Sequence, residues 1–156
     1  MNFFTCELLV HLIAAILASV AFSVLFHVSP RHLHIIAICS GITYFLYYTS
    51  LYFGSSPFTA ALLSTMLTAL VSEIAARARR APTIVFLIPS LIPTVPGAGL
   101  YNTMHHAISG NWEASLSYLS TTLQIALGIS GGIVFVSVTF GLVVDYLHKK
   151  KTNRTP

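Results

Sequence analysis

Long apolar runs separated by short polar connections make up most of this chain. Each run has about 20 residues, which is enough for a helix to cross the roughly 30 Å hydrocarbon core of a bilayer. The pattern predicts five membrane-spanning segments, at residues 8–28, 33–53, 58–76, 83–101 and 119–146. We therefore expect an all-α integral membrane protein in which residues 1–156 form a single membrane domain.

The fourth segment is apolar, but its sequence is unsuited to a continuous α-helix. It contains Pro89, Pro93 and Pro96, and each proline removes a backbone donor and clashes with the carbonyl four residues earlier. The residue before each proline is also pushed away from helical backbone angles. We expect the carbonyls of Val85, Pro89 and Ile92 to lose their usual donors, so that the helix is broken here.

A broken helix inside a membrane is typical of transport sites. Freed backbone groups are tolerated there only where protein or a water-filled cavity satisfies them, and half-helix ends can bind carboxylates and cations. The alternative is a structural kink packed against neighbouring helices. The predicted substrate pathway comprises Pro89, Pro93, Pro96, Gly97, Gly99 and Tyr101.

The stretch that follows the proline segment is more polar. We expect a short interfacial helix between residues 101 and 110, with Trp112 at the level of the lipid headgroups. The fifth segment then has some 28 residues, more than a perpendicular crossing needs, which predicts a tilted or extended helix.

Composition supports a membrane protein and argues against nucleic-acid binding. Hydrophobic residues make up 55% of the chain and charged residues only 8%, whereas soluble domains carry about 25% charged residues. The net charge is +4, but the basic residues flank apolar segments instead of forming one patch. They are Arg31, then Arg77, Arg79 and Arg80, then Lys149, Lys150, Lys151 and Arg154.

The basic residues also predict the orientation in the membrane. If all five segments cross, every Lys and Arg lies on one side, which is cytoplasmic by the positive-inside rule. The N-terminus is then outside and the C-terminus inside. A re-entrant fourth segment would put the C-terminal lysines outside, so we expect a full crossing with its Pro96-Gly97 break nearer the outer face.

Two residue pairs lie at helical spacing. Glu73 and Arg77, near the cytoplasmic end of the third segment, are spaced for an ion pair along a helix. We interpret them as structural, or alternatively as an inner mouth where Arg77 attracts an anionic substrate and Glu73 restrains it. Gly128 and Gly132 form a Gly-x-x-x-Gly pair, which predicts close packing against a helix of this chain or of a partner.

No metal site, cofactor or enzymatic activity is predicted. The seven histidines are scattered, and none lies at a ligand spacing from a cysteine or a carboxylate. His105 and His106 are interpreted as ordinary loop residues or, alternatively, as groups that couple transport to protons. The acidic residues in or near the spans lie towards the segment ends and include no paired carboxylates, which argues against an intramembrane enzyme.

A motif runs through the third connection and the proline segment. Glu73 is followed by an Ala-Arg pair ending at Arg77, by Pro82, and by a proline-rich run from Val85 to Gly97. An acidic residue, an Ala-Arg pair, a proline and an Ile-Pro-x-x-Pro-Gly run are typical of the membrane domain of the threonine/serine exporter family, which the chain resembles most closely over residues 73–101. The five-span layout extends the resemblance over the whole chain.

The resemblance implies a function and a partner. Family members occur as one fused chain or as two proteins, and this chain resembles the small subunit of the split type, similar to the small component of succinate exporters. It implies a secondary transporter subunit that exports threonine, serine or a dicarboxylate such as succinate across the bacterial inner membrane. Besides membrane lipid and the small carboxylate substrate, the implied partner is a larger membrane subunit of the same family.

Two alternatives stay open at this point. Five spans leave little room for two gating repeats, so a homo-oligomer is an alternative to the larger partner. The alternative function is a membrane subunit that assembles or stabilises a larger partner without itself transporting.

Overall fold

The chain folds into helices joined by short connections, and the computed structural model describes residues 2–152. The described residues contain no strand. The helices are α1 (Asn2–Leu25), α2 (Leu33–Tyr52), α3 (Pro57–Arg79), α4 (Ile84–Leu91), α5 (Gly97–Ile108) and α6 (Trp112–Thr152), and two short 3-10 turns are η1 (Pro30–His32) and η2 (Ile92–Thr94).

Four of these helices, α1, α2, α3 and α6, contain stretches long and apolar enough to cross a membrane. A fifth crossing is formed if the bent pair of residues 84–94 and 97–108, which turns by 47° at its break, counts as one span. The predicted all-α membrane architecture with a broken fourth segment is therefore confirmed, whereas the full crossing of that segment, as opposed to a re-entrant loop, stays a prediction.

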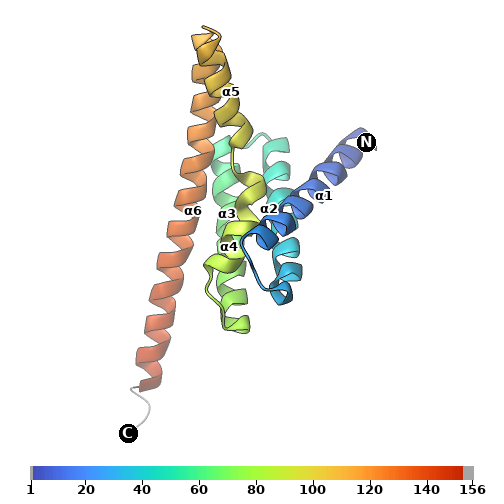
Figure 1. Cartoon of the computed structure of the whole chain (residues 1–156). Coiled ribbons are helices and arrows are strands. Elements are labelled where there is room, and N and C mark those ends of the chain that lie inside the picture. Colours follow the sequence, from blue (N-terminus) through green and yellow to red (C-terminus); the bar gives the residue numbers. More distant parts are fainter. Residues whose placement is uncertain (1, 153–156) are drawn as a thin grey trace.

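The connections gather at two ends of the molecule (Figure 1). The α1–α2 connection, the α3–α4 connection and the C-terminal end of α6 lie towards one end. The α2–α3 and α5–α6 connections lie towards the other end. The turns that carry Arg31, Arg79 and Arg80 thus share an end with the last turns of α6, while Arg154 lies outside the described residues.

The structure differs from the sequence expectation after the prolines. The helix α5 begins at Gly97, inside the predicted fourth segment, and runs to Ile108, so the end of that segment and the expected interfacial helix are one helix. Gly110, at φ 78°, ends it in a left-handed conformation. The side chain of Asn111 then accepts a hydrogen bond of 3.2 Å from the Ala114 N–H and caps α6 well before residue 119.

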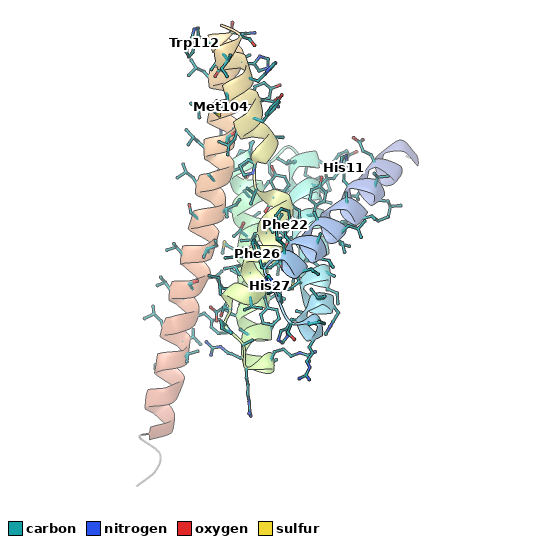
Figure 2. All side chains as sticks on the ribbon, viewed as in Figure 1. His11, Phe22, Phe26, His27, Met104 and Trp112 are labelled. Atoms are coloured by element: carbon teal, nitrogen blue, oxygen red, sulfur yellow. The ribbon has the colours of Figure 1, made fainter. Side chains whose placement is uncertain are left out.

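The helix α6 is much longer than α3, the helix on which it packs. At 1.5 Å per residue, the 41 residues of α6 extend for about 62 Å and the 23 residues of α3 for about 35 Å. The α5–α6 hairpin therefore projects beyond the α2–α3 connection, with the exposed Trp112 at its tip (Figure 2).

Small residues let α3 lie at the centre of the bundle. It packs against α2, α4 and α6, and its buried side chains are all alanine, serine or threonine. The α3 N-terminus is capped by Ser56, whose Oγ accepts from the Thr59 N–H at 3.3 Å. Its C-terminus ends at Arg80 in a left-handed conformation, where the chain turns back towards α4.

A compact apolar cluster anchors the start of α4. Phe86 is fully buried against Ile36, Ala75 and Ala76, and the His32 ring meets it edge-on with the ring centroids 5.1 Å apart. Burial of one phenylalanine stabilises a fold by roughly 1.5–3 kcal/mol. This cluster fixes the lower half of the broken crossing against α2 and α3.

The glycine pair of α6 packs within the chain. A Cβ atom at Gly128 would lie 2.6 Å from the Phe58 carbonyl oxygen, and one at Gly132 would lie 3.0 Å from the Leu62 carbonyl oxygen. Both carbonyls belong to α3. Of the two partners left open by the sequence, a helix of this chain is therefore the one that the pair contacts.

Candidate functional site

The proline-broken segment, which we call the broken crossing after its predicted path, consists of α4, η2 and α5, and each of its prolines has a different place. Pro89 is buried inside α4, Pro93 lies in η2, and Pro96 precedes the first residue of α5. Because a proline has no N–H, Pro89 and Pro93 leave the carbonyls of Val85 and Pro89 without the donors of a regular helix. The expectation for the Val85 and Pro89 carbonyls therefore agrees with the structure.

The third carbonyl, that of Ile92, also loses its usual donor, because residue 96 is a proline, but it gains a different one. The Ile92 carbonyl accepts a hydrogen bond of 3.2 Å from the Val95 N–H, because the 3-10 turn brings a donor from three residues ahead. The Thr94 hydroxyl donates to the Leu91 carbonyl at 2.8 Å, and the Gly97 N–H donates to the Val95 carbonyl at 2.8 Å. The carbonyls of Leu91, Ile92 and Val95 at the break therefore all accept hydrogen bonds within the turn.

Hydroxyl side chains line the interior that this crossing packs against. They come from α1, α2, α3, α4 and η2, and each is at most 3% exposed. In a bundle of apolar helices, such side chains are the main hydrogen-bonding groups of the interior. They are Ser19, Ser23, Ser40, Thr43, Ser64, Thr68, Ser72, Ser90 and Thr94; we refer to this set as the hydroxyl interior.

Two of these hydroxyls meet between helices. Thr43 Oγ1 of α2 and Thr68 Oγ1 of α3 lie within hydrogen-bonding distance of each other. Each also contacts a carbonyl one turn earlier in its own helix at 2.7 Å, that of Cys39 and that of Ser64. A hydroxyl has one proton and two acceptor lone pairs. The two hydroxyls have two protons for three contacts, namely the two with the carbonyls and the one with each other. Some of their oxygen lone pairs therefore accept no hydrogen bond.

Three other hydroxyls have unused hydrogen-bonding capacity. Within the hydroxyl interior, Ser19 Oγ, Ser72 Oγ and Ser90 Oγ are buried with no hydrogen-bond partner among the described residues. Outside this set, Thr65 Oγ1, whose side chain packs against Gly132 of α6, is buried and unpaired as well. Ser90, on the turn of α4 that leads into the break, lies against the Cys39 thiol. Buried polar groups are nearly always paired, so each exception needs an explanation. A polar molecule that passes along the broken crossing would supply the missing partners.

The Glu73–Arg77 pair lies towards α6 and away from this interior. The nearest nitrogen and carboxylate oxygen are 3.7 Å apart, and the Arg77 guanidinium lies 4.3 Å from the centre of the Phe140 ring. The ion pair expected from the sequence is present. Its role at the inner mouth stays a prediction.

The structure does not bring the outer residues of the predicted pathway to the break. Tyr101 is 68% exposed on α5 and stacks on His105, with ring centroids 5.9 Å apart. His106 stacks on Tyr118 of α6 at 5.4 Å. These rings belong to the projecting hairpin, and His105 and His106 are helical residues, not loop residues.

The two glycines of α5 have different surroundings. A Cβ at Gly99 would overlap the Thr122 hydroxyl of α6, whereas no described atom lies within 4 Å of a Cβ at Gly97. Gly99 therefore permits the close approach of α5 to α6. This residue of the predicted substrate pathway thus faces a neighbouring helix of the same chain.

Replacing Gly99 with alanine is expected to destabilise the protein by about 1 kcal/mol, because overpacking costs about 1–3 kcal/mol. The Thr122 hydroxyl cannot easily turn away, since it donates to the Tyr118 carbonyl at 2.7 Å. Gly97→Ala is the matched control and should be neutral or slightly stabilising. Thermal unfolding in detergent measures both, and the double variant Gly99→Ala/Thr122→Ala should recover the loss. Equal stability of the two single variants would contradict this packing.

Sequence reasoning missed the hydroxyl interior. Its signal was the spacing of Ser64, Thr68 and Ser72 in α3, and of Ser19 and Ser23 in α1, which repeat every four residues. Residues four apart share a helix face. A polar face on an otherwise apolar helix indicates a protein-facing surface in a membrane.

The comparisons with known proteins identify the family. Residues 11–139 match the family model described as "Threonine/Serine exporter, ThrE". Comparison with curated proteins and with solved structures gives no match. Within the described residues, no three His, Cys, Asp or Glu side chains gather where they could hold a metal ion. The match covers most of the chain, and the chain is helical with several candidate membrane spans. The chain therefore belongs to the threonine/serine exporter family.

Proposed function

We propose that this protein is a membrane subunit of a secondary transporter that exports a small hydroxy amino acid, threonine or serine, across the bacterial inner membrane. The observation that carries the proposal is the broken crossing, with the fully buried Ser90 hydroxyl at the end of α4, where its polar neighbour is the Cys39 thiol. Interrupted helices that pack into a polar interior are the usual substrate and ion sites of secondary transporters.

The chemistry of the site fits this substrate class. The start of α5 carries a partial positive charge that favours a carboxylate, and the unpartnered hydroxyls can exchange hydrogen bonds with a substrate hydroxyl or ammonium group. A dicarboxylate such as succinate has the carboxylates but no hydroxyl. The hydroxyl interior therefore favours threonine or serine, with a dicarboxylate as the second substrate to test.

Transport requires these helices to move apart. The cavity lined by Thr43 and Thr68 is only about 10 Å³, which is room for about one water molecule. A threonine cannot enter a space of this size. We infer that the bundle is closed in this conformation and opens along the α4–η2–α5 crossing, or against a partner.

The partner proposed is a larger membrane subunit of the same family. The candidate spans are mostly exposed in the isolated chain, with only 17% of the α1 and α6 stretches buried and 44% of the α3 stretch. Five crossings are also few for two gating halves. A homo-oligomer is the alternative assembly, and a subunit that stabilises its partner without transporting is the alternative function.

Efflux from preloaded cells tests the function. Cells expressing this chain with and without the proposed larger subunit are loaded with threonine, serine or succinate, and the rate of release is measured. We expect release of threonine or serine to depend on both proteins. If deleting this chain left the release of all three compounds unchanged, the exporter proposal would be wrong.

The orientation proposed is N-terminus outside and C-terminus inside. The arginine-bearing turns and the end of α6 lie at the same end of the molecule (Figure 1), and basic residues favour the cytoplasmic side. A fluorescent protein that folds only in the cytoplasm, fused after Pro156, is therefore expected to fluoresce. A secreted phosphatase fused at the same position should be inactive. The reverse pair of results would overturn the orientation.

A further inference from the structure

A groove between the lower halves of α3 and α6 is not used by the proposed transport site. Below the glycine contacts the two helices separate and leave a cavity of about 470 Å³. Its lining is almost wholly apolar. The walls include Met66, Leu67 and Leu70 from α3 and Val136, Phe140 and Val143 from α6.

The side chain of Arg77 lies beside this groove. Phe140, a wall residue, carries the Arg77 guanidinium over its ring at 4.3 Å. The Arg77 side chain is 51% exposed, and its contact with Glu73 at 3.7 Å is longer than a hydrogen bond. Among the described residues the guanidinium makes no hydrogen bond, so its donors are available to an oxyanion.

The charge around Arg77 is positive overall. Arg79 and Arg80 follow within one turn, and the acidic residues near the groove in sequence are Glu73 on α3 and Asp145, two residues after Val143 on α6. Three arginines against these two carboxylates leave an excess of one positive charge. Arg79 contacts His34 at 3.2 Å, which leaves Arg77 as the arginine placed on the groove.

We propose that this groove binds an acyl chain of an anionic phospholipid, with the lipid phosphate on Arg77. An apolar channel that ends at a basic group matches the two parts of such a lipid. Basic pockets between helices at the membrane surface bind anionic headgroups in this way. The lipid belongs to the leaflet on the side of the arginine turns.

A transmembrane helix is a poorer occupant of the same groove. Close helix contacts in membranes use glycine, alanine and serine, and Gly128, Gly131 and Gly132 of α6 are already engaged by α3. The groove walls carry branched, aromatic and thioether side chains instead. Such walls are deformable and suit a flexible chain better than a second helix surface.

Native mass spectrometry of the purified, delipidated full chain tests the proposal. Equal amounts of phosphatidylglycerol and phosphatidylethanolamine with identical acyl chains are added, and the bound lipid is quantified. We expect phosphatidylglycerol to be retained about fivefold over phosphatidylethanolamine, the ratio that a single basic residue supplies at a membrane surface. Arg77→Gln should bring the ratio close to one, and Arg77→Lys should keep most of the preference.

Leu70→Trp fills the groove and should reduce the binding of both lipids. Leu63→Trp is the matched control, because Leu63 is a similarly exposed leucine two turns away that does not line the groove. Val143→Trp serves as a second groove-filling variant if Leu70→Trp does not fold. An unchanged ratio in Arg77→Gln, or equal lipid loss in Leu63→Trp and Leu70→Trp, would overturn the proposal. The proposal would also be overturned if Leu70→Trp released a bound second protein chain while the amount of bound lipid stayed constant.

Discussion

Replacing Gly128 with valine is expected to cost more stability than any other single change considered for this chain. A Cβ at this position would lie 2.6 Å from the Phe58 carbonyl oxygen and 2.9 Å from the Ala61 Cβ. Both are rigid parts of α3, so α6 itself must shift. Overpacking typically costs about 1–3 kcal/mol, and we expect a loss at or above the upper end of this range.

Gly141→Val is the matched control for this prediction. Gly141 lies in the same helix, but no described atom lies within 4 Å of a Cβ built there. Valine should therefore be tolerated, with a small gain from its better helix propensity. Thermal unfolding of the purified protein, followed by size-exclusion chromatography, measures both variants. Similar midpoints for Gly128→Val and Gly141→Val would show that α6 does not pack on α3 through this glycine.

The membrane architecture could be predicted from the sequence because hydropathy is a local property. A run such as residues 58–76 is apolar whichever helix it contacts, so its length alone indicates a crossing. The proline break was predictable for the same reason, since a missing N–H at Pro93 is a covalent fact. The repair of the Ile92 carbonyl by Val95 was not, because it depends on the 3-10 geometry that the chain adopts after Pro93.

Helix pairing could not be predicted in the same way. Gly128 and Gly132 indicate a close contact, but the spacing carries no information about which helix supplies it. The start of α6 illustrates a second limit. Gly110 ends α5 and Asn111 caps α6. The residues that follow are polar, and for this reason the fifth segment was predicted to begin only at residue 119.

The hydroxyl interior was overlooked because serine and threonine are nearly neutral in hydropathy. Ser64, Thr68 and Ser72 leave α3 apolar enough to span a membrane, so they did not alter the prediction of a crossing. Their common face becomes evident only when α2 and α4 are placed against it. The cross-helix contact between Thr43 and Thr68 joins residues that are distant in sequence.

Replacing both Pro93 and Pro96 with alanine is expected to reduce efflux at least tenfold per assembled complex. Alanine restores two N–H donors and favours helix, so α4, η2 and α5 could join into one helix over residues 84–108. Straightening the 47° bend would move α5 away from α6. It would break contacts such as the 2.8 Å hydrogen bond from the Ser115 hydroxyl to the Thr103 carbonyl.

The efflux rate must be compared with the amount of complex in the membrane. Pro30→Ala is the control, because Pro30 begins the exposed η1 turn and its missing donor would be unpaired there in any case; it should leave both quantities unchanged. If the double variant lowers efflux while the complex stays abundant, the broken crossing takes part in transport. If the larger partner disappears while efflux per remaining complex is preserved, the chain is an assembly subunit, because a bend needed only for packing affects the number of complexes and not their rate.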